Sequence, residues 1–100
     1  MAEVRWSTDA EADLGDIVEF ISRDSPVRAR LVAHRIIERV EHLERFPGLG
    51  HTIAEDPTGR YRHVVYHPFR IIYRIDGERV FVIAIVHGAR DWSLRDDSST

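Results

Sequence analysis

The stretch FRIIYRI-DG-ERVFVIAIVH, residues 69–87, decides the fold of this 100-residue chain. Asp-Gly between two runs rich in β-branched and aromatic residues is the strongest short-range signal of a β-hairpin. Gly77 can adopt the positive φ that such a turn requires. In the first run, side chains alternate between the two faces of the strand. One face has Ile71, Tyr73 and Ile75, and the opposite face has Arg70, Ile72 and Arg74. We therefore predict two paired strands with Asp76-Gly77 at the tip.

The register of this hairpin is left open by the sequence. A two-residue loop at Asp76-Gly77 would set Arg74 opposite Arg79, which is unfavourable for two like charges. A three-residue loop with a bulge would avoid that pairing. The second run, residues 80–86, contains no polar residue, so we expect it to form a central strand that is covered on both faces.

Upstream of the hairpin, the sequence predicts a strand at residues 3–7 and two helices. Thr8 and Glu11 have the spacing of a capping box, and the first helix should run to about Ser22. Ser25 and Pro26 begin the second helix, which should end near Phe46 because Pro47 and Gly48 follow. Residues 49–59 have the composition of a loop, residues 61–66 of a strand, and His67-Pro68 of a turn.

These elements predict an α+β fold of two layers: an N-terminal strand, an antiparallel helical hairpin, and a three-stranded antiparallel meander packed on the helices. We expect the first strand to run antiparallel to residues 61–66 and 80–86. Gly15, inside the first helix, is expected to let the second helix approach closely. Residues 1–95 should form a single domain, followed by a short polar tail at residues 96–100.

Composition narrows the functional classes. There is no cysteine, which excludes disulfides and thiolate metal sites, and no run approaches the ~18 apolar residues of a membrane span. The first residues lack the apolar segment of a signal peptide, so we expect a cytoplasmic protein without a cofactor. His63 and His67 are separated by a proline turn and have no third ligand nearby, so we expect no metal site.

Charge is distributed unevenly along the chain. All 14 basic residues are arginine, a bias that either function or genome composition would produce. Residues 1–24 contain seven acids and two arginines, whereas residues 60–95 contain seven arginines and three acids. The acids of the first helix, Glu11, Asp13, Asp16 and Glu19, are interpreted as a solvated face. We expect the acidic and basic parts to attract different partners.

The order of elements, together with a set of residues spread over positions 3–92, resembles the RelE/ParE superfamily of bacterial toxins from type II toxin–antitoxin systems. The residues that support this resemblance are Trp6-Ser7, Ala10, Asp13-Leu14, Ile17, Leu43, Phe46-Pro47-Gly48, Phe69 to Arg74, and Val86 to Arg90. The closing segment His87-Gly88-Ala89-Arg90 is more similar to the ParE branch than to the RelE branch. The resemblance implies an antitoxin as partner.

The two branches differ in chemistry. RelE-like toxins cut messenger RNA on the ribosome with a cluster of basic residues and a C-terminal tyrosine, whereas ParE-like toxins inhibit DNA gyrase and are not enzymes themselves. By motif, the nuclease residues would be Arg62, Arg70 and Arg90, and His87 loosely matches a further branch. However, no tyrosine follows Tyr73, and another basic position of the motif falls near Val64, which is apolar.

Three hypotheses therefore remain at the level of the sequence. The first is a ParE-like toxin that targets gyrase, the second a RelE-like ribosome-dependent endoribonuclease, and the third an inactive relative that still binds its antitoxin. For the first, no catalytic residues are assigned, and the residues predicted to bind antitoxin or target are Arg62, Arg70, Arg74, Arg90 and Trp92. A structural role for Arg70 and Arg90, paired with an acid of the helices or the tail, is the alternative.

Overall fold

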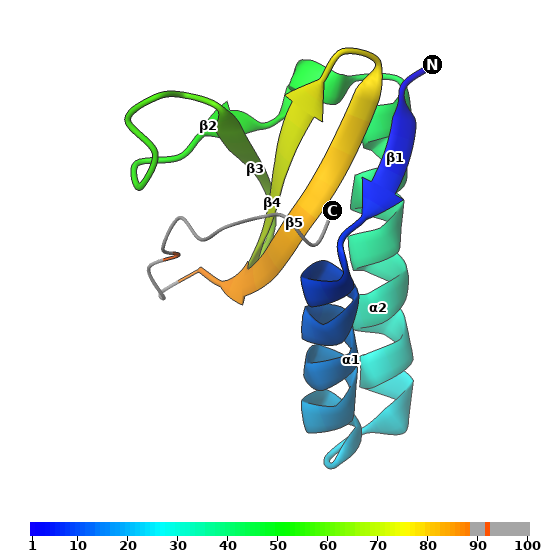
Figure 1. Ribbon diagram of the computed structural model, residues 1–100. Helices are drawn as coiled ribbons and strands as arrows, with labels where there is room; N and C mark the ends of the chain where they lie inside the picture. The colour runs from blue at the N-terminus through cyan, green and yellow to red at the C-terminus, as the bar shows by residue number, and fades with distance from the viewer. Residues whose placement is uncertain (89–91, 93–100) are drawn as a thin grey trace.

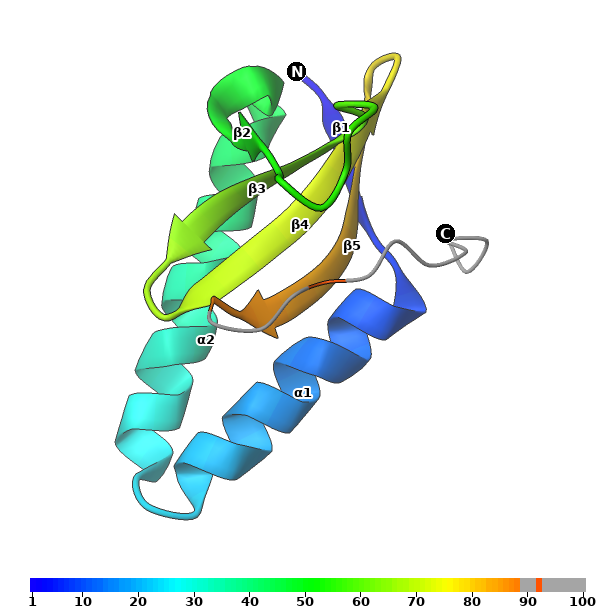
Figure 2. The same cartoon turned by 90° about the vertical axis from the view of Figure 1, so that its left-hand side faces the viewer.

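The computed structural model describes residues 1–88 and 92, which form two helices on one side of a five-stranded sheet (Figures 1 and 2). The predicted two-layer α+β fold is confirmed. In chain order the elements are β1 (Glu3–Trp6), α1 (Thr8–Ser22), α2 (Pro26–Glu41), the 3-10 helices η1 (His42–Glu44) and η2 (Pro47–Leu49), β2 (His51–Thr52), β3 (Tyr61–Tyr66), β4 (Phe69–Asp76) and β5 (Arg79–His87).

The sheet has the order β1-β5-β4-β3-β2, and the predicted antiparallel meander of β3, β4 and β5 is confirmed. The predicted direction of β1 was wrong, because β1 runs parallel to β5, with Glu3 opposite Arg79. Helix α1 continues beyond the end of β1 instead of folding back over the sheet (Figure 1). Helix α2 and η1 then return the chain to the beginning of β1, where the Ala2 N–H donates to the Glu44 carbonyl at 2.8 Å.

The junction between β1 and α1 is buried and hydrogen-bonded on both sides. Ser7, and not Thr8 as predicted, caps α1: its hydroxyl oxygen accepts from the Ala10 N–H at 3.0 Å. The same hydroxyl donates to the Ile83 carbonyl at 3.0 Å, while the Ser7 N–H donates to the Val82 carbonyl. Ser7 therefore ends the strand pairing and begins the helix, which is why the cap lies one residue earlier than the capping-box pattern indicated.

Beyond the end of β1, a helix side chain completes the edge of β5. The Asp13 carboxylate accepts from the Ile85 N–H at 2.9 Å. The interpretation of the α1 acids as a solvated face was therefore wrong for Asp13, which is half-buried. A backbone donor left without a strand partner needs such an acceptor.

The tip of the hairpin lies one residue later than predicted. Asp76 ends β4 opposite Arg79, and the two loop residues are Gly77, with φ +61°, and Glu78. Arg74 consequently faces Phe81 and not Arg79, so the unfavourable pairing does not occur. A bulge is present, but in the ladder: Ile72 pairs with Ala84 and Tyr73 with Val82, which leaves Ile83 between them.

Two apolar clusters sandwich the sheet. The first lies between the helices and the sheet and contains buried side chains such as Ile36, Leu43, Ile71 and Val82. The second lies on the face of the sheet without helices and contains Ile53, Tyr61, Ile72, Ile83, Ala84 and Trp92. The prediction that residues 80–86 form a central strand covered on both faces is confirmed by these clusters.

Three further details differ from the predictions. The α-helix of α2 ends at Glu41 and continues as η1, and the short strand β2 was not predicted. A Cβ built on Gly15 would have no atom within 4 Å, so Gly15 is not a point of close helix approach. Within the part of the chain that the structure describes, neither helix is long and apolar enough to span a membrane.

Candidate functional site

Arg70 is the centre of a polar network on the face of the sheet without helices. Its two terminal nitrogens donate to the two oxygens of Glu55, at 2.8 and 3.0 Å. Its Nε donates to Nδ1 of His63 at 2.9 Å. Glu55 also accepts from the Trp92 N–H at 3.1 Å, so the loop before β3, the strand β4 and residue 92 are joined at one carboxylate.

The network fixes the charge states of its members. Hydrogen bonds from Arg70, and then from the Trp92 N–H, lower the pKa of Glu55 to about 2. Burial, and then the positive charge of Arg70, lower the pKa of His63. Near neutral pH the Glu55 carboxylate is therefore ionised and the His63 ring is neutral, which is consistent with Nδ1 acting as an acceptor. His63 is thus placed to receive a hydrogen bond and not to donate a proton from that nitrogen.

Arg74 shares this face with Arg70 but has different partners. Its guanidinium lies over the Phe81 ring, 4.4 Å from the ring centre, and 3.7 Å from the Asp76 carboxylate. Trp92 lies on the same face, where it packs edge-on against Tyr61 with ring centres 5.2 Å apart. Three of the residues predicted to bind a partner, Arg70, Arg74 and Trp92, are therefore on one face of the sheet, and all three have contacts within the chain.

The other predicted residues do not join this group. Arg62 pairs in the ladder with Tyr73, whose side chain belongs to the helix-side core, and donates to the Gly50 carbonyl at 2.8 Å. Val64, near the missing basic position, is buried in the same core. His87 lines a groove on the helix side and packs edge-on against Phe69. Arg90 and the tail at residues 96–100 lie outside the described residues.

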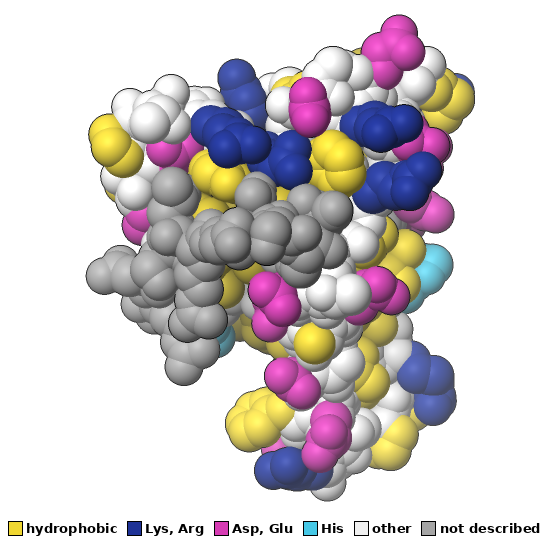
Figure 3. Space-filling view, in the orientation of Figure 1, with side chains coloured by type: hydrophobic (Ala, Val, Ile, Leu, Met, Phe, Trp, Pro, Cys, Tyr) yellow, Lys and Arg dark blue, Asp and Glu magenta, His cyan; other side chains and the backbone are white. Residues whose placement is uncertain are grey.

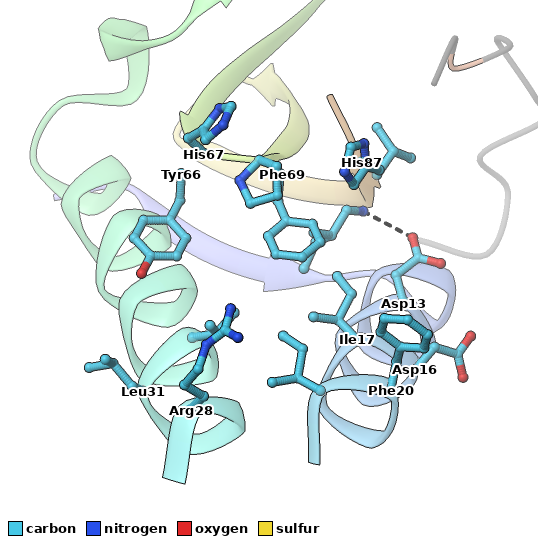
Figure 4. Close-up of a pocket in the computed structure, with 15 residues that line it drawn as sticks. Asp13, Asp16, Ile17, Phe20, Arg28, Leu31, Tyr66, His67, Phe69 and His87 are labelled. Carbon is cyan, nitrogen blue, oxygen red and sulfur yellow. Dashed lines mark hydrogen bonds between the residues drawn. The ribbon is translucent and has the colours of Figure 1, made fainter. Parts of the chain in front are cut away.

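A large groove lies where the two helices meet the sheet, and Figure 4 draws it. It has a volume of about 960 Å³ and lies between α1, α2, the β3–β4 turn and the end of β5. Its lining includes apolar residues of all four segments, among them Ile17, Val32, Phe69 and Ile85. Two large apolar side chains at this groove are exposed to solvent, Phe20 at 71% and Leu31 at 48%.

Acidic and basic side chains gather on different parts of the surface. Figure 3 shows arginine side chains gathered near the β4–β5 end of the sheet, whereas acidic side chains follow α1. Asp13 and Asp16 of α1 border the groove on one side, and Arg28 of α2 borders it on the other. Phe20 marks the α1 side of the groove in the sequence, because this aromatic residue lies outside the apolar stripe of Ala10, Leu14, Ile17, Val18 and Ile21.

Nothing in this geometry builds a metal centre. Among the described residues, no three His, Asp or Glu side chains are grouped so that they could hold a metal ion. On the face of the sheet without helices, Arg70 and Arg74 are already paired with acids of the chain. The groove can bury apolar groups of a ligand, and it has charged residues at its borders.

Comparison with known proteins places this geometry in context. The family model described as the ParE toxin of the type II toxin–antitoxin system parDE matches residues 4–92. The chain is 33% identical over 91 residues to a protein named Toxin RelE2 from Caulobacter vibrioides (strain ATCC 19089 / CIP 103742 / CB 15), a match that covers 90% of this chain and 99% of that protein.

Solved structures share the fold. A chain of the chromosomal ParDE TA system from P. aeruginosa has a TM-score of 0.74 and 24% identity, over 87% of this chain and 96% of that chain. A chain of the toxin–antitoxin complex RelBE2 from Mycobacterium tuberculosis has a TM-score of 0.65 and 22% identity, over 86% of this chain and 96% of that chain. At these identities the likeness concerns the fold alone.

Proposed function

Because this chain belongs to the family of ParE toxins of type II toxin–antitoxin systems, within the RelE/ParE superfamily, we propose that it inhibits DNA gyrase and is neutralised by a cognate antitoxin. The observation that carries this proposal is the match of the ParE model to residues 4–92. We propose the cytoplasm as the site of action, since gyrase acts on the chromosome there.

The arrangement of the arginines supports a binding protein over a nuclease. A cationic cluster that stabilises a phosphorane needs donors aimed at one point. Here the three guanidinium nitrogens of Arg70 donate to Glu55 and His63. Arg62 lies on the side of the sheet that faces the helices, and Val64 is apolar and buried. No tyrosine follows Tyr73.

A RelE-like, ribosome-dependent endoribonuclease is the second candidate. It is favoured by one observation, the name of the 33% identical relative, Toxin RelE2. In that case Arg62, Arg70, His87 and Arg90 are the residues to test, with the Arg70–Glu55 pair opening when RNA binds.

Two assays on the purified protein separate these candidates. The first follows gyrase supercoiling and the accumulation of broken DNA, and the second follows cleavage of ribosome-bound messenger RNA. We expect inhibition of gyrase and no cleavage of messenger RNA. Cleavage at codon positions that Arg90→Ala abolishes would establish the nuclease instead. Inactivity in both assays, with the antitoxin still bound, would support a relative that retains only antitoxin binding.

We propose that the antitoxin contributes a segment that folds on binding, covers the groove and contacts the arginines predicted to bind a partner. Its acidic residues would meet Arg62, Arg70, Arg74 and Arg90, near Trp92, through charge-assisted hydrogen bonds. Affinity for the product of the neighbouring gene should then fall as salt rises. Equal affinity of the parent and an Arg62/Arg70/Arg90 triple-alanine variant, at low and at high salt, would remove these three arginines from the interface.

A further inference from the structure

The tip of the β4–β5 hairpin joins an exposed aspartate to a glycine (Figure 1). Asp76 ends β4, and its side chain is 74% exposed. Gly77 is the first loop residue, and its φ of +61° at that position is typical of a type II′ turn. The ladder is closed by the pair of Asp76 and Arg79, so the N–H of Gly77 lies outside it. Among the described residues, this N–H has no hydrogen-bond acceptor.

At the other described aspartates, the backbone nitrogen that follows is either engaged or blocked. After Asp24, the Ser25 N–H donates to the Ile21 carbonyl at 2.9 Å. After Asp9, the next N–H donates to the hydroxyl that caps α1, at 3.0 Å. Asp56 precedes a proline, which has no N–H. Inside α1, helical hydrogen bonds use the N–H groups that follow Asp13 and Asp16.

We propose that Asp76 is a site of spontaneous covalent modification, at which the folded chain isomerises to L-isoaspartate. The Gly77 nitrogen attacks Cγ of the protonated Asp76 carboxyl group and loses its proton, and one carboxyl oxygen leaves as water. The product is a five-membered succinimide ring. Water then opens the ring at the main-chain carbonyl carbon of residue 76, and that carbon separates from the Gly77 nitrogen. The chain now runs through Cβ and Cγ, with the same atomic composition and no change in oxidation state.

The hairpin tip gives this reaction access that the rest of the fold denies. Residues 75–79 are all exposed, so Cγ of Asp76 can swing against the Gly77 nitrogen without moving a buried side chain. Gly77 has no Cβ to hinder the approach, and no atom of the fold stands within 4 Å of where one would be. Ring closure at Asp24 would instead require the Ser25 hydrogen bond to open first.

The modification would loosen the start of β1 as well as the hairpin. An extra backbone carbon between Ile75 and Gly77 takes Asp76 and Arg79 out of register. The carbonyl of the next loop residue, Glu78, accepts from the Glu3 N–H at 2.9 Å, and Nε of Arg79 lies 3.1 Å from the Glu3 carboxylate. Both contacts hold the first residue of β1, so the isomerised chain should lose protection there.

Storage of the folded full-length chain at physiological temperature for several weeks tests this inference. Trypsin then releases residues 75–79 and residues 24–28, so the exposed Asp24 serves as an internal control in the same sample. Chromatography separates the two isomers of each peptide, and a protein L-isoaspartate methyltransferase with labelled S-adenosylmethionine identifies the isoaspartate. A parallel sample stored in urea gives the ratio of the two rates that the sequence alone produces.

We expect isoaspartate in residues 75–79, formed faster in mildly acidic than in mildly alkaline buffer, because only the protonated carboxyl group loses water. The ratio of the Asp76 rate to the Asp24 rate should be about five- to tenfold higher in the folded chain than in urea, since the fold withholds only the Ser25 nitrogen. In the isomerised fraction, hydrogen exchange should accelerate at the Glu3 N–H by a similar factor. It should stay unchanged at the Ser7 N–H, which donates to the Val82 carbonyl.

Two variants complete the test. Asp76→Asn replaces the leaving water by ammonia, so folded samples should deamidate at this position, faster as the pH rises. Asp76→Glu would need a six-membered ring and should remove the isoaspartate signal of residues 75–79. Isomerisation of the parent in urea but not in the folded chain, together with an Asp76→Asn variant that is stable when folded, would show that the hairpin prevents ring closure and would overturn the inference. An equal ratio of rates in both samples would also overturn it.

Discussion

Replacement of Glu55 by glutamine should remove a pH-dependent part of the stability. The carboxylate has a pKa near 2 in the folded protein, compared with 4.5 in the unfolded chain. A difference of this size corresponds to at most about 3 kcal/mol of stability. The Glu55 and Arg70 side chains are 18% and 11% exposed, so solvent screens part of this interaction. We expect Glu55→Gln to cost about 1–2 kcal/mol at pH 7.

The sign of the pH dependence follows from the lowered pKa. The contribution of Glu55 is complete above the unfolded pKa of 4.5, and it is lost as the pH falls toward the folded pKa of about 2. A protonated carboxyl group resembles an amide in shape and charge. The difference in unfolding free energy between the parent and Glu55→Gln should therefore be constant from pH 7 to about 5 and shrink by more than half by about pH 3.

Urea unfolding of both proteins at several pH values measures this difference directly. A matched control is Glu41→Gln, because Glu41 is exposed and makes no ion pair among the described residues. The control should differ from the parent by a small amount at every pH. A stability difference for Glu55→Gln that stays the same from pH 7 to 3 would show that the pair with Arg70 does not stabilise the folded state.

Three further predictions concern the fold. Ser7→Ala should lower the free energy of unfolding by about 1–3 kcal/mol, because it removes the cap of α1 and leaves the Ile83 carbonyl without its donor. Thermal melting measures this loss, and an unchanged melting temperature would contradict the prediction. Ile83→Asp should bury an unpaired charge in the second apolar cluster and cost several kcal/mol; a variant that melts like the parent would show that residues 80–86 are not a core strand. Gly50→Ala should destabilise the protein more than Gly15→Ala. A Cβ added at position 50 would lie 2.5 Å from the carbonyl oxygen of His63, whereas a Cβ added at position 15 would have no atom within 4 Å. Equal denaturation midpoints of the two variants would refute this prediction.

Local patterns predicted the hairpin, both helices and the apolar stripes, because each depends on residues a few positions apart. The direction of β1 was not predictable in this way. It depends on where α1 points after Ser7 and on how far α2 and η1 carry the chain back toward Ala2. The capping position also depended on a distant element, since Ser7 is held by the carbonyl of Ile83.

The candidate site was predictable only in part, for the same reason. The sequence identified Arg70 as either a binding or a structural residue, but its partner Glu55 is separated from it by 15 residues and belongs to a loop whose path depends on the folded sheet. The groove is built by four segments that are distant in sequence, α1, α2, the β3–β4 turn and the end of β5, and the position of Phe20 outside the α1 stripe indicated only its α1 side.

The internal pairing of Arg70 changes how an acidic partner would be recognised. A carboxylate that approaches Arg70 has to replace Glu55, so one ion pair is exchanged for another and the net gain is small. Asp16 and Arg28 have no such partner among the described residues. An ion pair that a partner forms with either residue therefore adds binding free energy, reduced only by solvent screening and by the ordering of the side chains. An Arg70→Ala variant would leave Glu55 half-buried without its cation, and any loss of binding would mix instability with lost contacts. Comparison with Arg70→Ala combined with Glu55→Gln removes this ambiguity. If the combined variant binds the antitoxin like the parent while a variant with Asp16→Arg and Arg28→Asp does not, selectivity resides in the groove and not at Arg70.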